Sequence, residues 1–449
     1  MLKSLIAGAK TSNKAIWNIA YSIMLGNLAQ TIIAFTDTAF LGQLGEVELG
    51  AAAMSGIYYF FFTTLAWGFS IGVQIIIARR LGEGQIDKIV STLLHGFVFI
   101  LFFGSALFGV IHFLSPTFLR AVLSSDNVYN VSMDFLSYRA YGIFFASLNF
   151  MYRSFYIGLS KTRSISYSTV IMALVNIFLD WALIFGTPFN SPMGVQGAAL
   201  ASVAAEVSAT IFFTIYTMVT HPVQGHRVFR RFKFEMENIR GVLKLSLPTM
   251  MQKMVSYGLW LYFFFMVESM GERELAVTMV LRNIFMMISI PAFAFGAASN
   301  TITSRLIGEG REDEVVPTVY KVIRMSLIIT APLLLLIIFA PAFWVSLITN
   351  SQAIVEAAVP ICYLLCVTVL TFCVGMAFFE AVSGTGYTQK AFYIEIAALV
   401  LYALVIWYTV SVAQAPLIYV WSSEIIYSGM MCVLTILFMK HYNWRKRNM

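Results

Sequence analysis

Long apolar segments follow one another along almost the whole chain, and short polar stretches separate them. A helix needs about 20 predominantly apolar residues to cross the hydrocarbon core of a bilayer. By this criterion the pattern predicts twelve transmembrane helices. Their predicted ranges are 15–41, 50–77, 90–115, 131–158, 165–186, 194–219, 242–269, 276–303, 316–348, 354–384, 391–411 and 416–439.

The second half of the chain repeats the first. A shift of 226 residues aligns Gly45 with Gly271 and Gly82 with Gly308 without a gap. Neighbouring residues keep the same shift: Glu46, Glu48, Leu49, Arg79, Glu83, Gly84, Asp87, Gly158 and Thr162 align with Glu272, Glu274, Leu275, Arg305, Glu309, Gly310, Asp313, Gly384 and Thr388. Each copy has six predicted helices, an even number, so both copies enter the membrane from the same side. We therefore expect an all-α integral membrane protein with two parallel six-helix bundles around a central cleft.

The basic residues indicate the orientation of these bundles. Most of the 29 Lys and Arg residues fall at one set of helix ends, whereas the loops of the other side hold only Arg120 and Arg273. Cytoplasmic loops carry the excess of Lys and Arg. We expect a multi-pass protein of the inner (plasma) membrane with both termini cytoplasmic. The expected parts are an N-lobe at 1–219, a cytoplasmic linker at 220–240, and a C-lobe with a basic tail at 241–449.

The composition is that of a membrane-embedded chain. Hydrophobic residues make up 59% and charged residues 11%, against about 25% charged in soluble domains. The net charge of +7 comes from helix ends, so we expect no nucleic-acid partner. The four cysteines lie in apolar segments, where they act as small hydrophobic residues. Two halves that rock around a central cleft would open it to each side in turn, which favours a transporter. No phosphate-binding loop or metal-ligand spacing is present, so we expect ion gradients and not ATP to drive transport, without a cofactor.

Two acidic residues lie inside predicted helices. A carboxylate at mid-membrane costs about 2.5–3.5 kcal/mol even on the mild insertion scale. Asp37 and Asp180 both fall toward the outer ends of their helices, so we expect them at similar depth. Asn176 precedes Asp180 by one helical turn and shares its face. The small residues around Gly197 would let the first, fifth and sixth predicted helices approach closely.

Two neighbouring carboxylates in a low dielectric must hold a proton or a cation. The oxygens of Asp37, Asn176, Asp180 and the Ser202 hydroxyl would suit a hard ion such as sodium. The alternative is that each is a structural polar group with its own partners. Further candidates, for lining a substrate cleft, are Asn27, Gln30, Asn149 and Tyr138.

The second half lacks the acid pair, since Phe263 and Ile406 occupy the aligned positions. It carries Lys253, Glu380 and Glu395 toward the predicted cytoplasmic ends. A Lys253–Glu380 pair, joined by Arg153, would close the inner side; the alternative is snorkelling or a local structural pair. Glu206 and Glu424 rank behind these as candidates.

The chain resembles the multidrug and toxic compound extrusion (MATE) transporters over essentially its whole length. The resemblance rests on the two-half layout, on the Asp37–Gly45 stretch, similar to the family's D-x-x-x-x-G-x-L-G, and on the duplicated Arg-x-x-Gly-Glu-Gly. It implies export of organic, often cationic, compounds against proton or sodium entry. The acids resemble those of the DinF-like branch, which implies a cation site that the backbone carbonyl at Ala198 and the Ser202 hydroxyl would complete.

Two departures accompany the resemblance. Ser256 stands where the NorM-like branch has a glutamate, which argues against that arrangement. Ser22 replaces the proline often present in the family's first helix, so any bend there would depend on Gly26 or polar side chains. We therefore expect a monomeric antiporter that exports small amphipathic or cationic xenobiotics and drugs. The alternatives are a flippase for a lipid-linked precursor and an intramembrane enzyme that uses Asp37 and Asp180 as acid and base.

Overall fold

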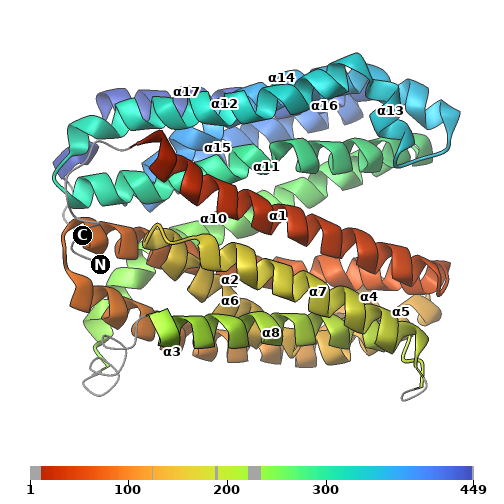
Figure 1. Cartoon of the computed structure of the whole chain (residues 1–449). Helices are drawn as coiled ribbons and strands as arrows, with labels where there is room; N and C mark the ends of the chain where they lie inside the picture. Colours follow the sequence, from red (N-terminus) through yellow and green to blue (C-terminus); the bar gives the residue numbers. More distant parts are fainter. Residues whose placement is uncertain (1–11, 124, 188–190, 221–233, 447–449) are drawn as a thin grey trace. The chain divides into compact units, whose positions relative to one another are not determined.

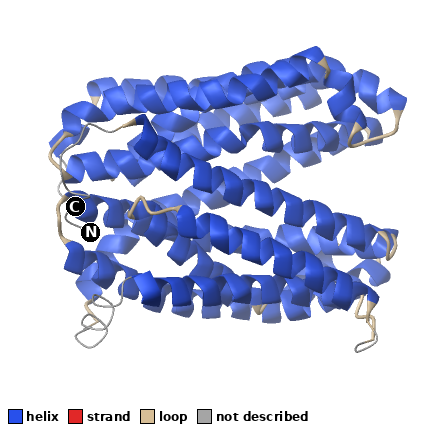
Figure 2. Ribbon diagram, in the orientation of Figure 1, coloured by secondary structure: helices blue, strands red, loops and turns tan. Residues whose placement is uncertain are grey.

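The computed structural model describes residues 12–446 except 124, 188–190 and 221–233. Over these residues the chain is helical and contains no β-sheet (Figure 2), which confirms the expected all-α class there. Most of the predicted linker at 220–240, together with Lys3, Lys10 and Arg447, lies outside the described residues.

The helices follow the predicted order (Figure 1). Several continue past the predicted ends, because apolar runs do not mark where a helix stops. Their bounds are α1 Asn13–Gly42, α2 Glu46–Gly82, α3 Ile86–Gly109, α4 Ser115–Val122, α5 Asp126–Arg139, α6 Gly142–Gly158, α7 Arg163–Phe185, α8 Val195–Thr220, α10 Met236–Glu268, α11 Glu272–Gly308, α12 Val315–Phe339, α13 Pro341–Ser346, α14 Gln352–Gly384, α15 Thr388–Trp407, α16 Leu417–Trp421 and α17 Ser423–His441.

Within the described residues, ten helical segments are long and apolar enough to cross a membrane. The long helix α10 is not among them, since Gln252 and Lys253 interrupt its apolar sequence. The other predicted span that is missing is 131–158, and the prediction of one continuous helix there is wrong. The chain instead forms α5 and α6, with a turn at Ala140 and Tyr141.

A largely buried ion pair lies beside this turn. A Cβ atom at Gly142, the first residue of α6, would lie 2.6 Å from Glu206 Oε2 and would overlap the Arg139 guanidinium. Only glycine leaves that space. A residue with a side chain at the start of α6 would therefore displace Arg139 from Glu206.

The described chain divides into two compact units. One contains the residues up to 24, 78–84 and from 251 onward; the other contains 25–77 and 85–250. The division runs through α1, α2 and α10, so each of these helices contributes to both units. The lobe boundaries expected from the sequence stay a prediction.

The duplicated Arg-x-x-Gly-Glu-Gly motif ends α2 and α11 with the same backbone. Gly84 and Gly310 have φ angles of +71° and +70°, in the left-handed region that glycine adopts without strain after a helix. In both copies the glutamate N–H donates to the carbonyl of the motif arginine, at 3.0 Å in the first copy and 2.9 Å in the second. The motif is therefore a helix stop that the chain uses twice.

The two copies of this motif also contact each other, within the unit that holds residues 78–84 and 251 onward. A Cβ at Gly82 would overlap the carbonyl oxygen of Arg305, and a Cβ at Gly308 would overlap that of Arg79. The contact is reciprocal, as a two-fold relation between the repeats requires. Arg79 Nη2 also donates to the Thr385 carbonyl at 3.1 Å. The glycines allow two helix ends to cross with their backbones in contact.

Candidate functional site

Asp37 of α1 and Asp180 of α7 lie in the unit that contains residues 25–77 and 85–250. Each is five residues from the last residue of its helix, or about 8 Å along the axis. The structure brings their carboxyl groups within hydrogen-bonding reach of each other. Asp180 and Asn176 are fully buried, whereas Asp37 is half-buried.

The polar atoms around this pair lack protein partners. Asp37 Oδ1, both carboxylate oxygens of Asp180, and the side-chain oxygen and nitrogen of Asn176 are buried without a hydrogen bond to any described residue. Buried polar atoms are nearly always paired. Two carboxylates that face each other cannot pair, because neither has a hydrogen to donate when both are ionised. A proton shared by the two carboxyl groups, or a cation bound between them, would give these atoms a partner.

Close helix packing creates this arrangement. A Cβ at Gly26 of α1 would contact Thr169 Oγ1 of α7 at 3.4 Å. A Cβ at Gly197 of α8 would lie 2.7 Å from the backbone of Leu183 in α7. Small residues at these points let α1 and α8 approach α7, as the sequence indicates.

Ala198 and Ser202 of α8, which are expected to complete the site, differ from each other in burial. Ala198 is buried and its N–H donates to the Gly194 carbonyl at 3.2 Å. Ser202 lies one turn farther along α8 and is half-buried. The described contacts include none between Ser202 and either acid. The roles of Ala198 and Ser202 stay predictions.

A charged cluster that the sequence does not reveal lies beside the acid pair. Arg139 of α5 donates two hydrogen bonds to Glu206 of α8, at 2.6 Å and 2.9 Å, and both side chains are 14% exposed. The guanidinium stacks 4.0 Å from the ring centroid of Tyr59 in α2. Arg139 is also an electrostatic neighbour of Asp37. One largely buried cation therefore pairs with the Glu206 carboxylate and also interacts electrostatically with Asp37.

We expect Arg139→Met to destabilise the protein strongly. Removing one partner of a buried ion pair leaves the other charged and unpaired, which costs about 3–5 kcal/mol. The double variant Arg139→Met/Glu206→Gln should recover much of this loss. Arg120→Met, which breaks the exposed Arg120–Asp126 pair, is the matched control and should cost less than about 1 kcal/mol. Thermal unfolding in detergent measures all three; equal losses for Arg139→Met and Arg120→Met would show that burial of the Arg139–Glu206 pair contributes nothing.

Three of the four predicted cleft residues are at least partly exposed, and the fourth, Asn149, is bonded within the protein. Asn27 is half-buried and Gln30 exposed on α1, and Tyr138 of α5 is half-buried. Asn149 is engaged instead: its amide nitrogen donates to the Glu206 carbonyl at 2.9 Å, and its amide oxygen accepts from Thr210 at 3.0 Å. Asn149 therefore joins α6 to α8.

The acids of the second half form their own cluster. Glu380 accepts a hydrogen bond from Asn300 at 3.0 Å. Glu395 accepts one from Ser256 at 2.5 Å and counts Lys253 and Glu380 among its electrostatic neighbours. Lys253 is thus a neighbour of Glu395, a partner that the sequence analysis did not give it, and the expected Lys253–Glu380 pair stays a prediction.

Arg153, the third member of the expected inner-side group, is on α6 in the other unit. Its guanidinium lies 3.8 Å from where a Cβ of Gly26 would be. The inner-side group as a whole stays a prediction.

Both halves of the chain match the model of a known protein family. The family model MatE matches residues 22–182 and 248–409, more than half of the chain. The two matches begin 226 residues apart, the same shift that aligns the halves in sequence. Repetition of one family unit thus explains the duplicated motif.

Two relatives are named as drug-resistance proteins. The chain is 26% identical over 303 residues to the "Probable multidrug resistance protein NorM" of Agrobacterium fabrum, which covers 65% of each chain. It is 24% identical over 339 residues to the "Probable multidrug resistance protein YoeA" of Bacillus subtilis, covering 73% of this chain and 72% of the relative. The chain thus spans about two thirds of the length of the curated relatives it matches.

A solved structure shows the same fold. The structure described as "Outward-facing conformation of a multidrug resistance MATE family transporter of the MOP superfamily" has a TM-score of 0.88 and 20% identity, and covers 95% of both chains. At this identity the likeness concerns the fold.

Proposed function

Because this chain belongs to the MatE family, we propose that it is a multi-pass transporter that exports small amphipathic or cationic molecules by antiport against protons or sodium ions. The observation that carries this proposal is the pair of facing acids, Asp37 and Asp180, whose buried oxygens have no partner in the described chain. An entering proton or sodium ion supplies the missing positive charge.

The donor set suits either ion. A single proton shared by Asp37 and Asp180 removes one charge and provides the hydrogen bond that two carboxylates lack. Sodium prefers oxygen ligands, and Asp37, Asp180 and the Asn176 side chain present oxygens; Ser202 and the Ala198 carbonyl would add to them. The chain's own part is to hold these oxygens out of water beside a fixed cation, Arg139. We assign the coupling acids to the first half, as the resemblance to the DinF-like branch implies.

Repeated architecture supports alternating access. We take α5 with α6, and α10, as two further membrane crossings, which brings the total to twelve in two parallel repeats. Rocking of such repeats opens a central site to each side in turn. A bound cation and a bound substrate each favour one state, so their binding is coupled through that equilibrium. We place both termini on the cytoplasmic side of the plasma membrane, and the working unit is one chain.

Efflux from proteoliposomes tests the proposal. A fluorescent organic cation is loaded into vesicles that contain the purified protein, and proton and sodium gradients are imposed separately. We expect at least one gradient to drive dye movement, and collapse of that gradient to stop it. Dye movement that ignores both gradients would contradict antiport. Tight binding of a lipid diphosphate in the same vesicles would instead favour a flippase.

A further inference from the structure

One face of α12 carries exposed side chains at helical spacing, and we call it the α12 band. Its two basic residues come first, about one turn apart, and apolar residues continue from there to the end of the helix. The α12 band consists of Lys321, Arg324, Ile328, Pro332, Leu335 and Phe339. A helix face with cations at one end and apolar side chains beyond them matches the headgroup and the acyl chain of a phospholipid in order and direction.

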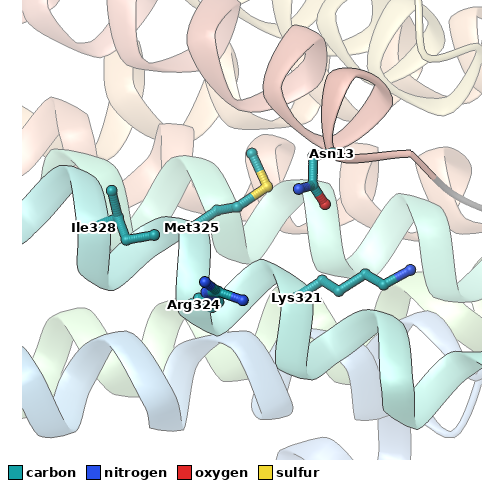
Figure 3. Close-up of a pocket in the computed structure, with 5 residues that line it drawn as sticks. All are labelled: Asn13, Lys321, Arg324, Met325 and Ile328. Atoms are coloured by element: carbon teal, nitrogen blue, oxygen red, sulfur yellow. The ribbon is translucent and has the colours of Figure 1, made fainter.

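A groove of about 290 Å³ lies at the basic end of this band. It is lined by Asn13, the first residue of α1, and by Lys321, Arg324, Met325 and Ile328 of α12. Figure 3 shows Met325 pointing from α12 toward Asn13, with Lys321 and Arg324 farther along the same helix toward its start. The lining therefore combines two cations, one amide and two apolar side chains, and it includes no acid.

Arg324 has no acidic partner among the residues that the structure describes. It lies nine residues after Val315, where α12 begins, or about 14 Å along the axis. It forms no hydrogen bond or ion pair with any residue that the structure describes. A guanidinium that far along an apolar helix is costly unless an anion or water reaches it. The planar guanidinium binds phosphate through two parallel hydrogen bonds.

We propose that this groove binds the phosphate group of an anionic phospholipid, with an acyl chain along the apolar part of the α12 band. The basic end of α12 is the end we place at the cytoplasmic side, where anionic lipids attract Lys and Arg. The lipid supplies the charge that Arg324 lacks, and its chain covers Ile328 and Leu335. The inference depends on a membrane-spanning α12 but not on the acid pair of the other unit.

Native mass spectrometry of the purified, detergent-solubilised protein tests this site. Phosphatidylglycerol and phosphatidylcholine with identical chains are titrated separately. We expect one phosphatidylglycerol to bind more tightly than phosphatidylcholine. Loss of each basic residue should weaken the binding about fivefold, and Lys321→Gln/Arg324→Gln about thirtyfold, from a contribution near 1 kcal/mol per basic residue. Arg324→Lys keeps the charge but loses the two parallel hydrogen bonds, so its affinity should lie between those of the wild type and Arg324→Gln.

Lys440→Gln, which removes an exposed basic residue at the end of α17, is the matched control and should bind the lipid as the wild type does. Size-exclusion profiles confirm that each variant is folded before titration. The proposal is overturned if the double variant binds phosphatidylglycerol like the wild type, or if the two lipids bind equally. Displacement of the lipid by inorganic phosphate at equal concentration would also overturn it, because it would show an anion site that does not use the acyl chain.

Discussion

Asp37→Asn should abolish cation-driven export while the protein remains folded in the membrane. Asparagine keeps the shape of the side chain but can neither take up a proton nor offer a charged ligand to sodium. The coupling between cation and substrate is then lost, and coupling free energies of 1–3 kcal/mol correspond to changes of about 5- to 150-fold. Asp180→Asn should have the same effect, because the two carboxyl groups face each other. The initial rate of dye export under an imposed gradient measures both.

Asp134→Asn is the matched control, since Asp134 is an exposed acid on α5 in the same unit. Its export rate should equal that of the wild type. The double variant Asp37→Asn/Asp180→Asn should be no worse than either single variant, because the two acids act as one site. Undiminished export by Asp37→Asn would remove Asp37 from the mechanism.

Gly82→Ala and Gly308→Ala should each destabilise the backbone contact between the ends of α2 and α11. The added Cβ would meet a backbone carbonyl, of Arg305 or Arg79, and a backbone atom cannot rotate away as a flexible side chain can. Overpacking of this kind typically costs about 1–3 kcal/mol. We expect a lower midpoint of thermal unfolding for each variant and slower export, because the two motifs can no longer cross in contact.

Gly56→Ala provides the control in the same helix as Gly82. Nothing lies within 4 Å of a Cβ at that position, and alanine is favoured over glycine inside a helix by about 0.5–1 kcal/mol. This variant should be as stable as the wild type or slightly more stable. If Gly82→Ala unfolds at the same temperature as Gly56→Ala, the contact between the two motifs does not constrain the protein.

The sequence singles out the two acids because each signal is local to one helix. Asp37 and Asp180 lie near the ends of apolar segments, and an i, i+4 spacing sets Asn176 beside Asp180. Gly197 in a run of small residues indicates close packing. From these features the meeting of the two carboxyl groups follows once the helices are parallel neighbours.

The Arg139–Glu206 pair could not be predicted from the sequence. Its members are 67 residues apart, and no spacing rule connects side chains on helices that are not consecutive. The break in the predicted helix 131–158 was missed for a similar reason. Gly142 looks like an ordinary small residue of an apolar segment, and its purpose is visible only when Arg139 and Glu206 occupy the adjacent space.

The duplicated motif is an intermediate case. The sequence shows that Arg79–Gly84 and Arg305–Gly310 are copies, and glycine after a helix predicts a left-handed stop. It does not show that the two helix ends contact each other, because a repeat in the sequence does not say whether its copies lie close together in the fold. The role of Ser256 was hidden for a related reason: its bond to Glu395 joins α10 to α15.

The most direct test of the coupling claim is the ion released when substrate binds to purified protein in detergent, where no gradient exists. A pH indicator in weak buffer and a sodium-selective electrode follow the two ions. We predict that adding an organic cation releases protons or sodium from the wild type and from Asp134→Asn, and none from Asp37→Asn or Asp180→Asn. Equal release from the wild type and from Asp180→Asn, or no release from any of them, would contradict a cation site formed by these two acids.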